Sequence, residues 1–292
     1  MNAKHFIQLF IPPIYYKVKQ RLFPKKKQEV YPLAMRAHNG KRMVVIGNGP
    51  SLNKTMELYG DIVRNTPCMM VNFAANTELF EILKPSTYLL VDPAWYNLTE
   101  QLKTTVKSCI DAICKKTTWQ LKIIMPRCAE GCYATERFKA NSNLEVLYFE
   151  DGWNRPKNMN LFEAWDKNLI SPPGQTVMNT AVWLSIYWGY EETYIVGADT
   201  SWLEDTHVDQ DDNRVYTIDT HFYNNKEVYK DSNLWKENRR YIPSKYHEEI
   251  ETVVIALKSY WELRKYADWK GVKVYNASEY SCIDAFERKK LK

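Results

Sequence analysis

The sequence lacks any apolar run of the roughly 18 residues that a helix needs to cross a bilayer. The apolar segment Phe6–Tyr16 is too short and is broken by Pro12 and Pro13. It also lacks a preceding basic stretch and a small-residue cleavage site, so we expect no secretory signal peptide. These absences argue against an integral membrane protein and against a secreted one.

Cysteine pairs of the kind that bind zinc are also absent. The cysteines are Cys68, Cys109, Cys114, Cys128, Cys132 and Cys282. Only Cys128 and Cys132 lie close together, and no second pair is present to complete a metal site. Since nothing else indicates secretion, we expect reduced thiols in a cytoplasmic protein.

Two common nucleotide-binding motifs are missing as well. The turn Gly47-Asn48-Gly49-Pro50-Ser51 follows an apolar run, but Leu52 stands where G-x-G-x-x-G requires a third glycine. No Gly-Lys-Ser/Thr follows, so the turn is not a Walker loop, and its proline lacks a backbone donor. These departures argue against a dinucleotide or triphosphate cradle. They leave a single phosphate, or a ribose and base, as the ligand of the turn.

The 292 residues fit one large α/β domain or two small ones, and 45% hydrophobic with 26% charged residues indicates an ordered globular chain. The charge is uneven, because residues 1–42 hold seven Lys, three Arg and one Glu, a net +9, and the remainder carries −4. A nucleic-acid-binding protein should carry its basic patch on the folded part, so we expect no nucleic-acid partner.

Basic residues border the apolar segment near the start of the chain. They are Lys17, Lys19, Arg21, Lys25, Lys26 and Lys27. Such a segment suits an anionic membrane surface, at about 1 kcal/mol per basic residue. We therefore expect residues 1–41 to form a basic amphipathic arm that holds a cytoplasmic protein peripherally at the inner membrane. A solvated arm is the alternative.

Short apolar runs predict buried strands. They lie at 42–46, 68–72, 87–92, 121–125, 144–149 and 193–196. Stretches long enough for helices separate them, such as 99–115 and the strongly apolar 174–189. This alternation predicts an α/β fold with a Rossmann-like, mostly parallel sheet and helices on both faces.

The alternation breaks over residues 200–246, which are polar and aromatic and keep no period. A long segment of this kind is usually functional, so we expect an irregular lid there. An amphipathic helix returns over 247–269, followed by a last strand at 271–276. The expected organisation is a nucleotide-binding α/β domain at 42–199, the lid, and a closing helix and strand of the same domain at 247–292.

Four of the predicted strands lead into a polar residue: Asn48, Asn72, Asp92 and Asp199. In an open parallel sheet, ligands bind at the carboxyl ends of the strands, near the point where strand order reverses. The four residues therefore predict one ligand site at that edge. The alternative is that each of them only caps the following helix.

These elements, in this order, resemble a known family. The strand into Gly-Asn-Gly-Pro-Ser-Leu, the strand ends at Asn72 and Asp92, the turn Pro173-Gly174-Gln175-Thr176 and the strand into Gly197-Ala198-Asp199 are similar to bacterial lipooligosaccharide sialyltransferases. The wider set includes sialyltransferase-like proteins of polysaccharide loci, motility-linked glycosyltransferases and pterin pyrophosphokinase-like relatives. The resemblance covers roughly residues 42–200 and returns at the last helix and strand.

The resemblance implies a GT-A-like Rossmann variant with a lid, which binds a CMP-linked nonulosonic acid such as sialic acid or Kdo. It implies transfer to a hydroxyl of a surface glycan or glycolipid without a cofactor. Residues expected to bind nucleotide or donor sugar are Asn48, Gly49, Pro50, Ser51, Asn72, Asp92, Gln175, Thr176, Asp199, Ser201, Trp202 and Tyr223. Two departures, Asp92 in place of an Asn and Pro172-Pro173 in place of an Arg, favour CMP-sugar transfer in general over sialic acid itself.

Inverting transfer needs a base to take the proton of the acceptor hydroxyl, and His titrates nearest to neutral pH. Of the five histidines, His221 and His247 are the candidates. His221 neighbours aromatic residues that can stack on a sugar or base, and His247 lies near the position that the resemblance implies for the base. A surface or helix-capping role is the alternative for each.

The acidic run Asp209–Asp212 is a candidate for Mg²⁺, although such clusters are usually only solvated. A leaving CMP carries less charge than a nucleoside diphosphate, so hydroxyls and a helix N-terminus can stabilise it without a divalent ion. We therefore expect no metal. Two other functions stay open: an ATP-dependent pyrophosphokinase-like enzyme, and a non-catalytic sugar- or nucleotide-binding protein of a polysaccharide assembly. A homo-oligomer stays open as well.

Overall fold

The computed structural model describes residues 41–98, 103–151, 159–231, 233–236 and 240–292. The expected membrane arm therefore lies outside the described residues, apart from its last position. Residues 99–102 of the expected helix 99–115 lie outside them as well. All the strands and helices below belong to one compact unit.

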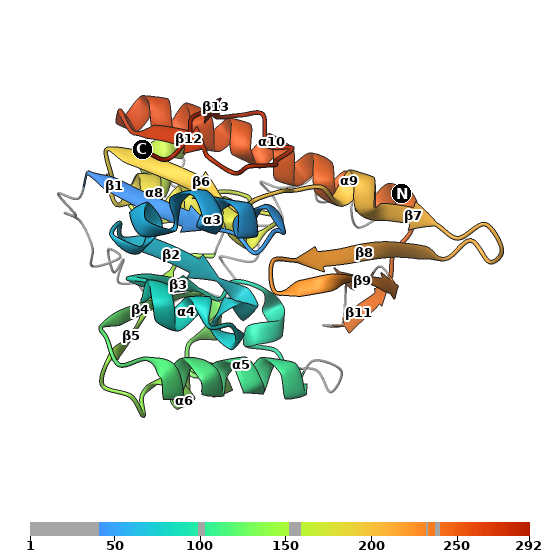
Figure 1. The fold of residues 1–292 in the computed structure, drawn as a ribbon, viewed down its shortest axis with the longest axis horizontal. Coiled ribbons are helices and arrows are strands. Elements are labelled where there is room, and N and C mark those ends of the chain that lie inside the picture. Colours follow the sequence, from blue (N-terminus) through green and yellow to red (C-terminus); the bar gives the residue numbers. More distant parts are fainter. Residues whose placement is uncertain (1–40, 99–102, 152–158, 232, 237–239) are drawn as a thin grey trace, which may run out of the picture. The chain divides into compact units, whose positions relative to one another are not determined.

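Eight strands form one sheet in the order β13-β12-β6-β1-β2-β3-β4-β5, and every neighbouring pair in it is parallel (Figure 1). They are β1 Arg42–Ile46, β2 Cys68–Val71, β3 Thr87–Leu89, β4 Leu121–Pro126, β5 Leu144–Phe149, β6 Glu192–Val196, β12 Lys273–Asn276 and β13 Glu287–Arg288. The central strands β1 and β2 are buried almost throughout, which is why they read as continuous apolar runs. The predicted Rossmann-like α/β fold is confirmed.

Helices cover both faces of the sheet. The first face holds α3 Ser51–Arg64, η1 Asn72–Asn76, α4 Leu79–Leu83, α5 Lys103–Lys116 and α6 Tyr133–Phe138, which share one apolar cluster. The other face holds α7 Leu161–Asp166, α8 Val177–Tyr187 and α10 Tyr246–Lys270, which share a second cluster. Short turns are η2 Pro93–Trp95, η3 Arg127–Ala129 and α9 Trp202–Asp205. None of the described helices has the length and apolarity to cross a membrane.

The strand order reverses between β1 and β6. From β1 the chain builds β2 to β5 in one direction, with α3 to α6 on one face of the sheet. It then passes over the other face through α7 and α8 and returns as β6 on the opposite side of β1. The carboxyl ends of these two strands are therefore the place where a fold of this kind binds ligands.

Residues 200–246 differ from the expected irregular segment. They contain α9, an antiparallel sheet β7-β8-β9 and an antiparallel pair β10-β11. The strands are β7 Thr206–Val208, β8 Val215–His221, β9 Asn224–Asp231, β10 Asn233–Lys236 and β11 Arg240–Pro243. In Figure 1, β8 and β9 lie to the right of the parallel sheet. Small antiparallel sheets are held by cross-strand backbone hydrogen bonds, so their sequences need no sustained apolar period.

Candidate functional site

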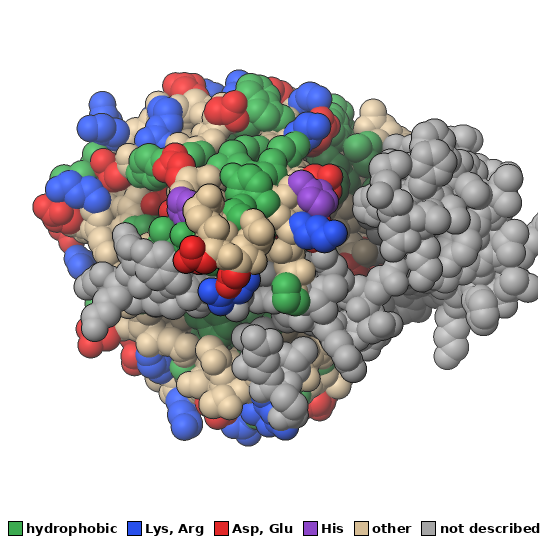
Figure 2. Space-filling model, turned by 90° about the vertical axis from the view of Figure 1, so that its right-hand side faces the viewer, with side chains coloured by type: hydrophobic (Ala, Val, Ile, Leu, Met, Phe, Trp, Pro, Cys, Tyr) green, Lys and Arg blue, Asp and Glu red, His purple; other side chains and the backbone are tan. Residues whose placement is uncertain are grey.

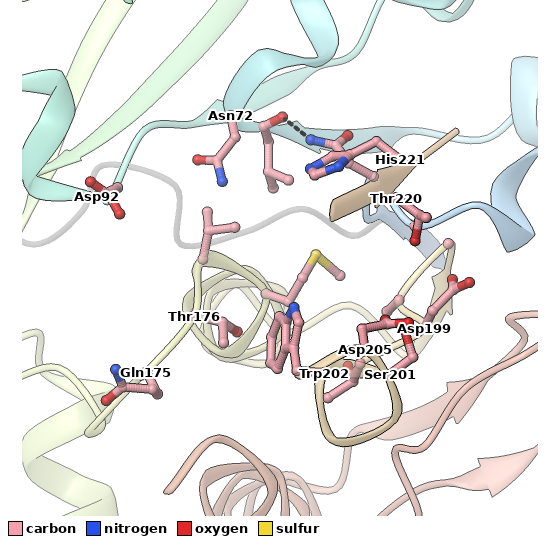
Figure 3. Close-up of a pocket in the computed structure, with 18 of the residues that line it drawn as sticks. Asn72, Asp92, Gln175, Thr176, Asp199, Ser201, Trp202, Asp205, Thr220 and His221 are labelled. Atoms are coloured by element: carbon pink, nitrogen blue, oxygen red, sulfur yellow. Dashed lines mark hydrogen bonds between the residues drawn. The ribbon is translucent and has the colours of Figure 1, made fainter. Parts of the chain in front are cut away.

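A cavity of about 460 Å³ lies at the switch between β1 and β6. Its volume is in the range typical of small-molecule sites. It is lined by the loops after β1, β2, β3 and β6, the start of α8 and the end of β8. In Figure 3, Asn72 and His221 lie on one side of the cavity, and Thr176 and Trp202 lie on the other. The antiparallel hairpin therefore completes a site that the parallel sheet begins.

Most of the residues that the sequence pointed to meet at this cavity. They are Asn48, Gly49, Pro50, Asn72, Asp92, Gln175, Thr176, Asp199, Ser201, Trp202 and His221. The other three, Ser51, Tyr223 and His247, do not line it. Ser51 is buried, and Tyr223 is exposed with its ring centroid 5.0 Å from that of His221. His247 lies exposed in the first turn of α10, so the structure brings only His221 of the two candidate bases to the cavity.

The turns after β1 and β6 approach so closely that glycine is required. Gly47 N–H donates to the Val196 carbonyl, and Gly49 N–H donates to the Gly197 carbonyl, each at 2.8 Å. A Cβ atom on Gly49 would lie 2.6 Å from Cγ of Asp199 and 2.9 Å from the Gly197 oxygen. The glycines of the Gly-Asn-Gly-Pro-Ser turn therefore allow two backbones to meet.

Asp199 fixes the start of α3. Its carboxylate accepts the Ser51 N–H at 3.0 Å and the Ser51 hydroxyl at 2.5 Å. Burial raises the pKa of this carboxyl group, while the hydrogen bonds from Ser51 act in the opposite direction. The next two N–H groups of the helix donate to carbonyls of the turn itself. Because a carboxylate already occupies the N-terminus of α3, the turn is a poor phosphate site. Of the ligands that the sequence left open for this turn, the single phosphate therefore does not fit.

Asp92 is a helix cap as well. Its Oδ1 accepts the Ala94 N–H at 2.7 Å at the start of η2, although Asp92 also lines the cavity. Asp92 therefore has the capping role that the sequence left open, whereas Asp199 caps α3, which is not the helix that follows it in the chain. The two asparagines are different.

Asn48 and Asn72 present enclosed amide oxygens at the cavity. Asn48 donates through Nδ2 to the Val71 carbonyl at 3.2 Å, and its Oδ1 accepts no hydrogen bond from the described residues. The same holds for Oδ1 of Asn72, whose backbone is left-handed with φ of 51°. The Tyr88 hydroxyl holds that backbone by donating to the Asn72 carbonyl at 2.6 Å. A buried acceptor without a donor costs free energy, so each oxygen would gain from an N–H or O–H donor.

Gln175 and Thr176 lie at the N-terminus of α8, where Asn179 holds them. Asn179 Oδ1 accepts the N–H groups of both residues, at 3.3 and 3.2 Å, and Thr176 Oγ1 accepts the Asn179 N–H at 3.3 Å. The Asn179 amide also donates to the Ala256 carbonyl of α10 at 3.2 Å. This capping box ties the turn to α10, and the first residues of α8 line the cavity.

The loop after β6 contributes Ser201, Trp202 and Asp205 to the cavity. Ser201 Oγ donates to Asp205 at 2.6 Å. Sequence reasoning missed Asp205. The one feature that could have indicated it is its position four residues after Ser201, which places the two side chains together on a helical turn. Thr200 also lines the cavity with φ of 55°, a strained conformation for a β-branched residue.

The surface around α9 is apolar and exposed. Trp202 is 38% exposed, Leu203 is 46% exposed, and Tyr280 donates to the Glu204 carboxylate at 2.6 Å from the neighbouring C-terminal loop. α9 lies on the side of the molecule that faces the viewer in Figure 2, where hydrophobic side chains gather with acidic side chains and histidines beside them. An exposed Trp at a cavity can stack on a base or on the face of a sugar ring.

β8 brings His221 to the cavity together with Thr217, Ile218 and Thr220, which sequence reasoning missed. In a regular strand, adjacent side chains point to opposite faces, yet Thr217 and Ile218 both line the cavity, as do Thr220 and His221, so the end of β8 contributes both of its faces. The register between β8 and β9 shifts between Asp219 and His221, and such an irregularity re-aims side chains. The sequence carries no signal for it, because the shift depends on the partner strand.

The acidic run Asp209–Asp212 forms the turn between β7 and β8. Asp209 Oδ1 accepts the N–H groups of Asp211 and Asp212 at 2.9 and 3.2 Å, and these bonds lower the pKa of Asp209. Across the described ranges, no three His, Cys, Asp or Glu side chains converge as metal ligands would. Turn formation therefore accounts for these aspartates.

The cavity lining is acidic. It includes the carboxyl groups of Asp92, Asp199 and Asp205, while no Lys or Arg belongs to its described residues. Like charges repel strongly at the short distances inside a cavity. The lining therefore repels a phosphate, and repels a diphosphate or triphosphate without a metal ion more strongly.

No model of a known protein family matches the chain, and no curated protein matches it by sequence. Among solved structures, the chain is similar to a MAf glycosyltransferase from Magnetospirillum magneticum AMB-1, with 13% sequence identity and a TM-score of 0.47. The match covers 89% of this chain and 35% of that one, so this chain spans about a third of that protein's length. A likeness at this level carries no argument about activity.

Proposed function

We propose that this chain is a glycosyltransferase that takes a nonulosonic acid, such as sialic acid or Kdo, from a CMP-activated donor. The acceptor is a hydroxyl of a surface glycan or glycolipid, and the configuration at the anomeric carbon inverts. One observation carries the proposal. A single cavity at the switch point holds His221 and two enclosed amide oxygens opposite the exposed ring of Trp202 and the start of α8 (Figure 3).

The lining offers a separate partner for each part of such a donor. The amide oxygens of Asn48 and Asn72 accept hydrogen bonds from the cytosine amino group or the ribose hydroxyls. The ring of Trp202 stacks on the base or the sugar. The N-terminus of α8 carries partial positive charge and suits the donor's phosphate or carboxylate, since Asp199 already occupies the N-terminus of α3.

His221 acts as the general base in this proposal. A ring nitrogen takes the proton of the acceptor hydroxyl while the acceptor oxygen bonds to the anomeric carbon. The bond from that carbon to the phosphate oxygen breaks, and its electron pair leaves with CMP. The acidic lining favours this leaving group over a nucleoside diphosphate, whose additional charge it would repel.

A thermal-shift panel of CMP, CDP, UDP, GDP and ATP, each with and without Mg²⁺, tests the nucleotide. A ligand at a hundredfold its Kd stabilises a folded protein by about 2.7 kcal/mol, so CMP should raise Tm by several degrees. Stabilisation only by ATP with Mg²⁺ would support the pyrophosphokinase-like alternative. The absence of any shift would contradict a nucleotide site.

The His221→Asn variant separates catalysis from binding. We expect turnover of CMP-sugar to fall by about 10²–10⁴-fold, the usual size of general-base catalysis, while CMP still raises Tm. His207→Asn is the matched control, because His207 lies on the neighbouring strand β7 and does not line the cavity. Loss of turnover in His247→Asn instead would assign the base to His247. Wild-type protein that binds CMP and transfers no sugar would support a non-catalytic binding protein.

A further inference from the structure

Phe222, the residue after His221, is clamped to the β1–α3 region. Its N–H donates to the Asn48 carbonyl at 3.0 Å, and its carbonyl accepts the side-chain N–H of Asn53, also at 3.0 Å. Its side chain is buried and belongs to the apolar cluster on the α3 face of the sheet. Both backbone groups and the ring of Phe222 are thus held from outside its own hairpin.

The hairpin needs such a fixed point. β8 pairs with β7 and β9 in a separate antiparallel sheet, and within the described residues none of the three joins the eight-stranded sheet. The register between β8 and β9 shifts between Asp219 and His221, and beyond the shift His221 pairs with Asn224, so the regular alternation of β8 does not continue to His221. The bonds of Phe222 hold the residue next to His221 against the turn at residues 47–51 and the start of α3.

We propose that Asn53 is a positioning residue for His221, a role that rests on the glycosyltransferase function proposed above. Asn53 lies in the first turn of α3, is exposed and does not line the cavity. Its amide fixes the carbonyl of Phe222, while the Asn48 carbonyl fixes the Phe222 N–H. The turn at residues 47–51 and His221 are therefore held by the same contacts. These contacts set the distance between the imidazole and a bound donor.

Asn53→Asp tests this role, because it keeps the size of the side chain and replaces an amide donor by an oxygen that repels the Phe222 carbonyl. An acidic side chain in the first turn of a helix is favourable, so the variant should fold. Asn65→Asp is the matched control. It removes an equivalent donor, since Asn65 Nδ2 donates to the Asp61 carbonyl at 2.8 Å, at the far end of the same helix.

The rate of hydrogen exchange at the Phe222 N–H measures how firmly Phe222 is held, and it does not depend on turnover. We expect Asn53→Asp to speed this exchange and to lower kcat, each by about tenfold, with KM for CMP-sugar changed by less than about twofold. Asn65→Asp should match the wild type in all three. A general loss of stability would not separate kcat from KM in this way.

Unchanged exchange at Phe222 in Asn53→Asp overturns the clamp, and faster exchange with unchanged kcat overturns the positioning role. If wild-type protein transfers no sugar, the glycosyltransferase proposal fails by itself. The NMR signal of the His221 imidazole then decides the inference. A shift in Asn53→Asp that Asn65→Asp does not produce supports it, and an unmoved signal overturns it.

Discussion

Gly49 stands where the turns after β1 and β6 come closest, and its replacement tests how tight that approach is. We expect Gly49→Ala to lower the free energy of unfolding by about 1–3 kcal/mol, because its Cβ would overlap the Asp199 carboxyl group and the Gly197 oxygen. Gly60→Ala is the control within α3, since its Cβ would have 3.5 Å to the nearest atom and Ala favours a helix. Equal losses in urea unfolding would contradict the tight approach.

Asp199 and Asp209 should respond to pH in opposite directions. Burial raises the pKa of Asp199, so the folded protein binds that proton more tightly than the unfolded chain does. Its stabilising contribution is therefore present below about pH 4 and is lost as pH rises through the raised value. Backbone N–H groups lower the pKa of Asp209, so its contribution is present above about pH 4 and is lost as pH falls.

Urea unfolding of wild type, Asp199→Asn and Asp209→Asn from about pH 3 to about pH 7 measures both effects. As pH rises, the free energy of unfolding of wild type minus that of Asp199→Asn should fall. The corresponding difference for Asp209→Asn should rise. If both differences rise with pH, the hydrogen bonds from Ser51 outweigh the burial of Asp199.

At the scale of single residues, sequence reasoning placed polar side chains at strand ends but could not assign their tasks. Asp92 and Asp199 accept backbone N–H groups, as caps do. Asn48 and Asn72 keep an amide oxygen enclosed at the cavity. Asp92 accepts the N–H of Ala94 two residues further on, whereas Asp199 meets Ser51, which lies far from it in the sequence.

At the scale of elements, the N-terminus of α8 depends on one buried side chain. We expect Asn179→Ala to lower the free energy of unfolding by about 2–3 kcal/mol, because it removes the capping box and leaves the Ala256 carbonyl without that donor. CMP binding should weaken too, since Gln175 and Thr176 lose their anchor. Ser185→Ala is the control on α8, where one local bond to the Val182 carbonyl is lost at a cost below about 1 kcal/mol. Equal effects of both variants on Tm and CMP binding would contradict this role.

The elements themselves were predictable where an apolar period specified them. The strands of the parallel sheet other than β13, and the helices α8 and α10, follow from apolar runs and helical spacing, whereas β13 is a pair of exposed charged residues that no apolar run announces. The strands of residues 206–243 do not, because the segment keeps no apolar period from which their antiparallel pairing could be read. For that reason a segment that sequence reasoning treated as irregular supplies part of the cavity wall.

At the scale of the whole molecule, the net charge of +5 combines a +9 segment at residues 1–42 with a remainder of −4. We propose that the basic segment binds anionic membranes. The triple change of Lys25, Lys26 and Lys27 to Gln should weaken binding to anionic vesicles by about 3 kcal/mol, or roughly a hundredfold. The same change at three exposed lysines of the described part, Lys139, Lys258 and Lys265, should have little effect. Equal losses, or equal binding to neutral vesicles, would contradict the proposal.

The sequence by itself determined the α/β class, the parallel sheet and the edge of that sheet where the cavity lies. These follow from local apolar periods and from the general rule for open parallel sheets. Only the tertiary structure decided that His221 rather than His247 reaches the cavity, and that Asp199 caps α3. The physical reason is that both depend on contacts between segments distant in the chain, which no local pattern records. The clamp of Phe222 by Asn48 and Asn53 is such a contact.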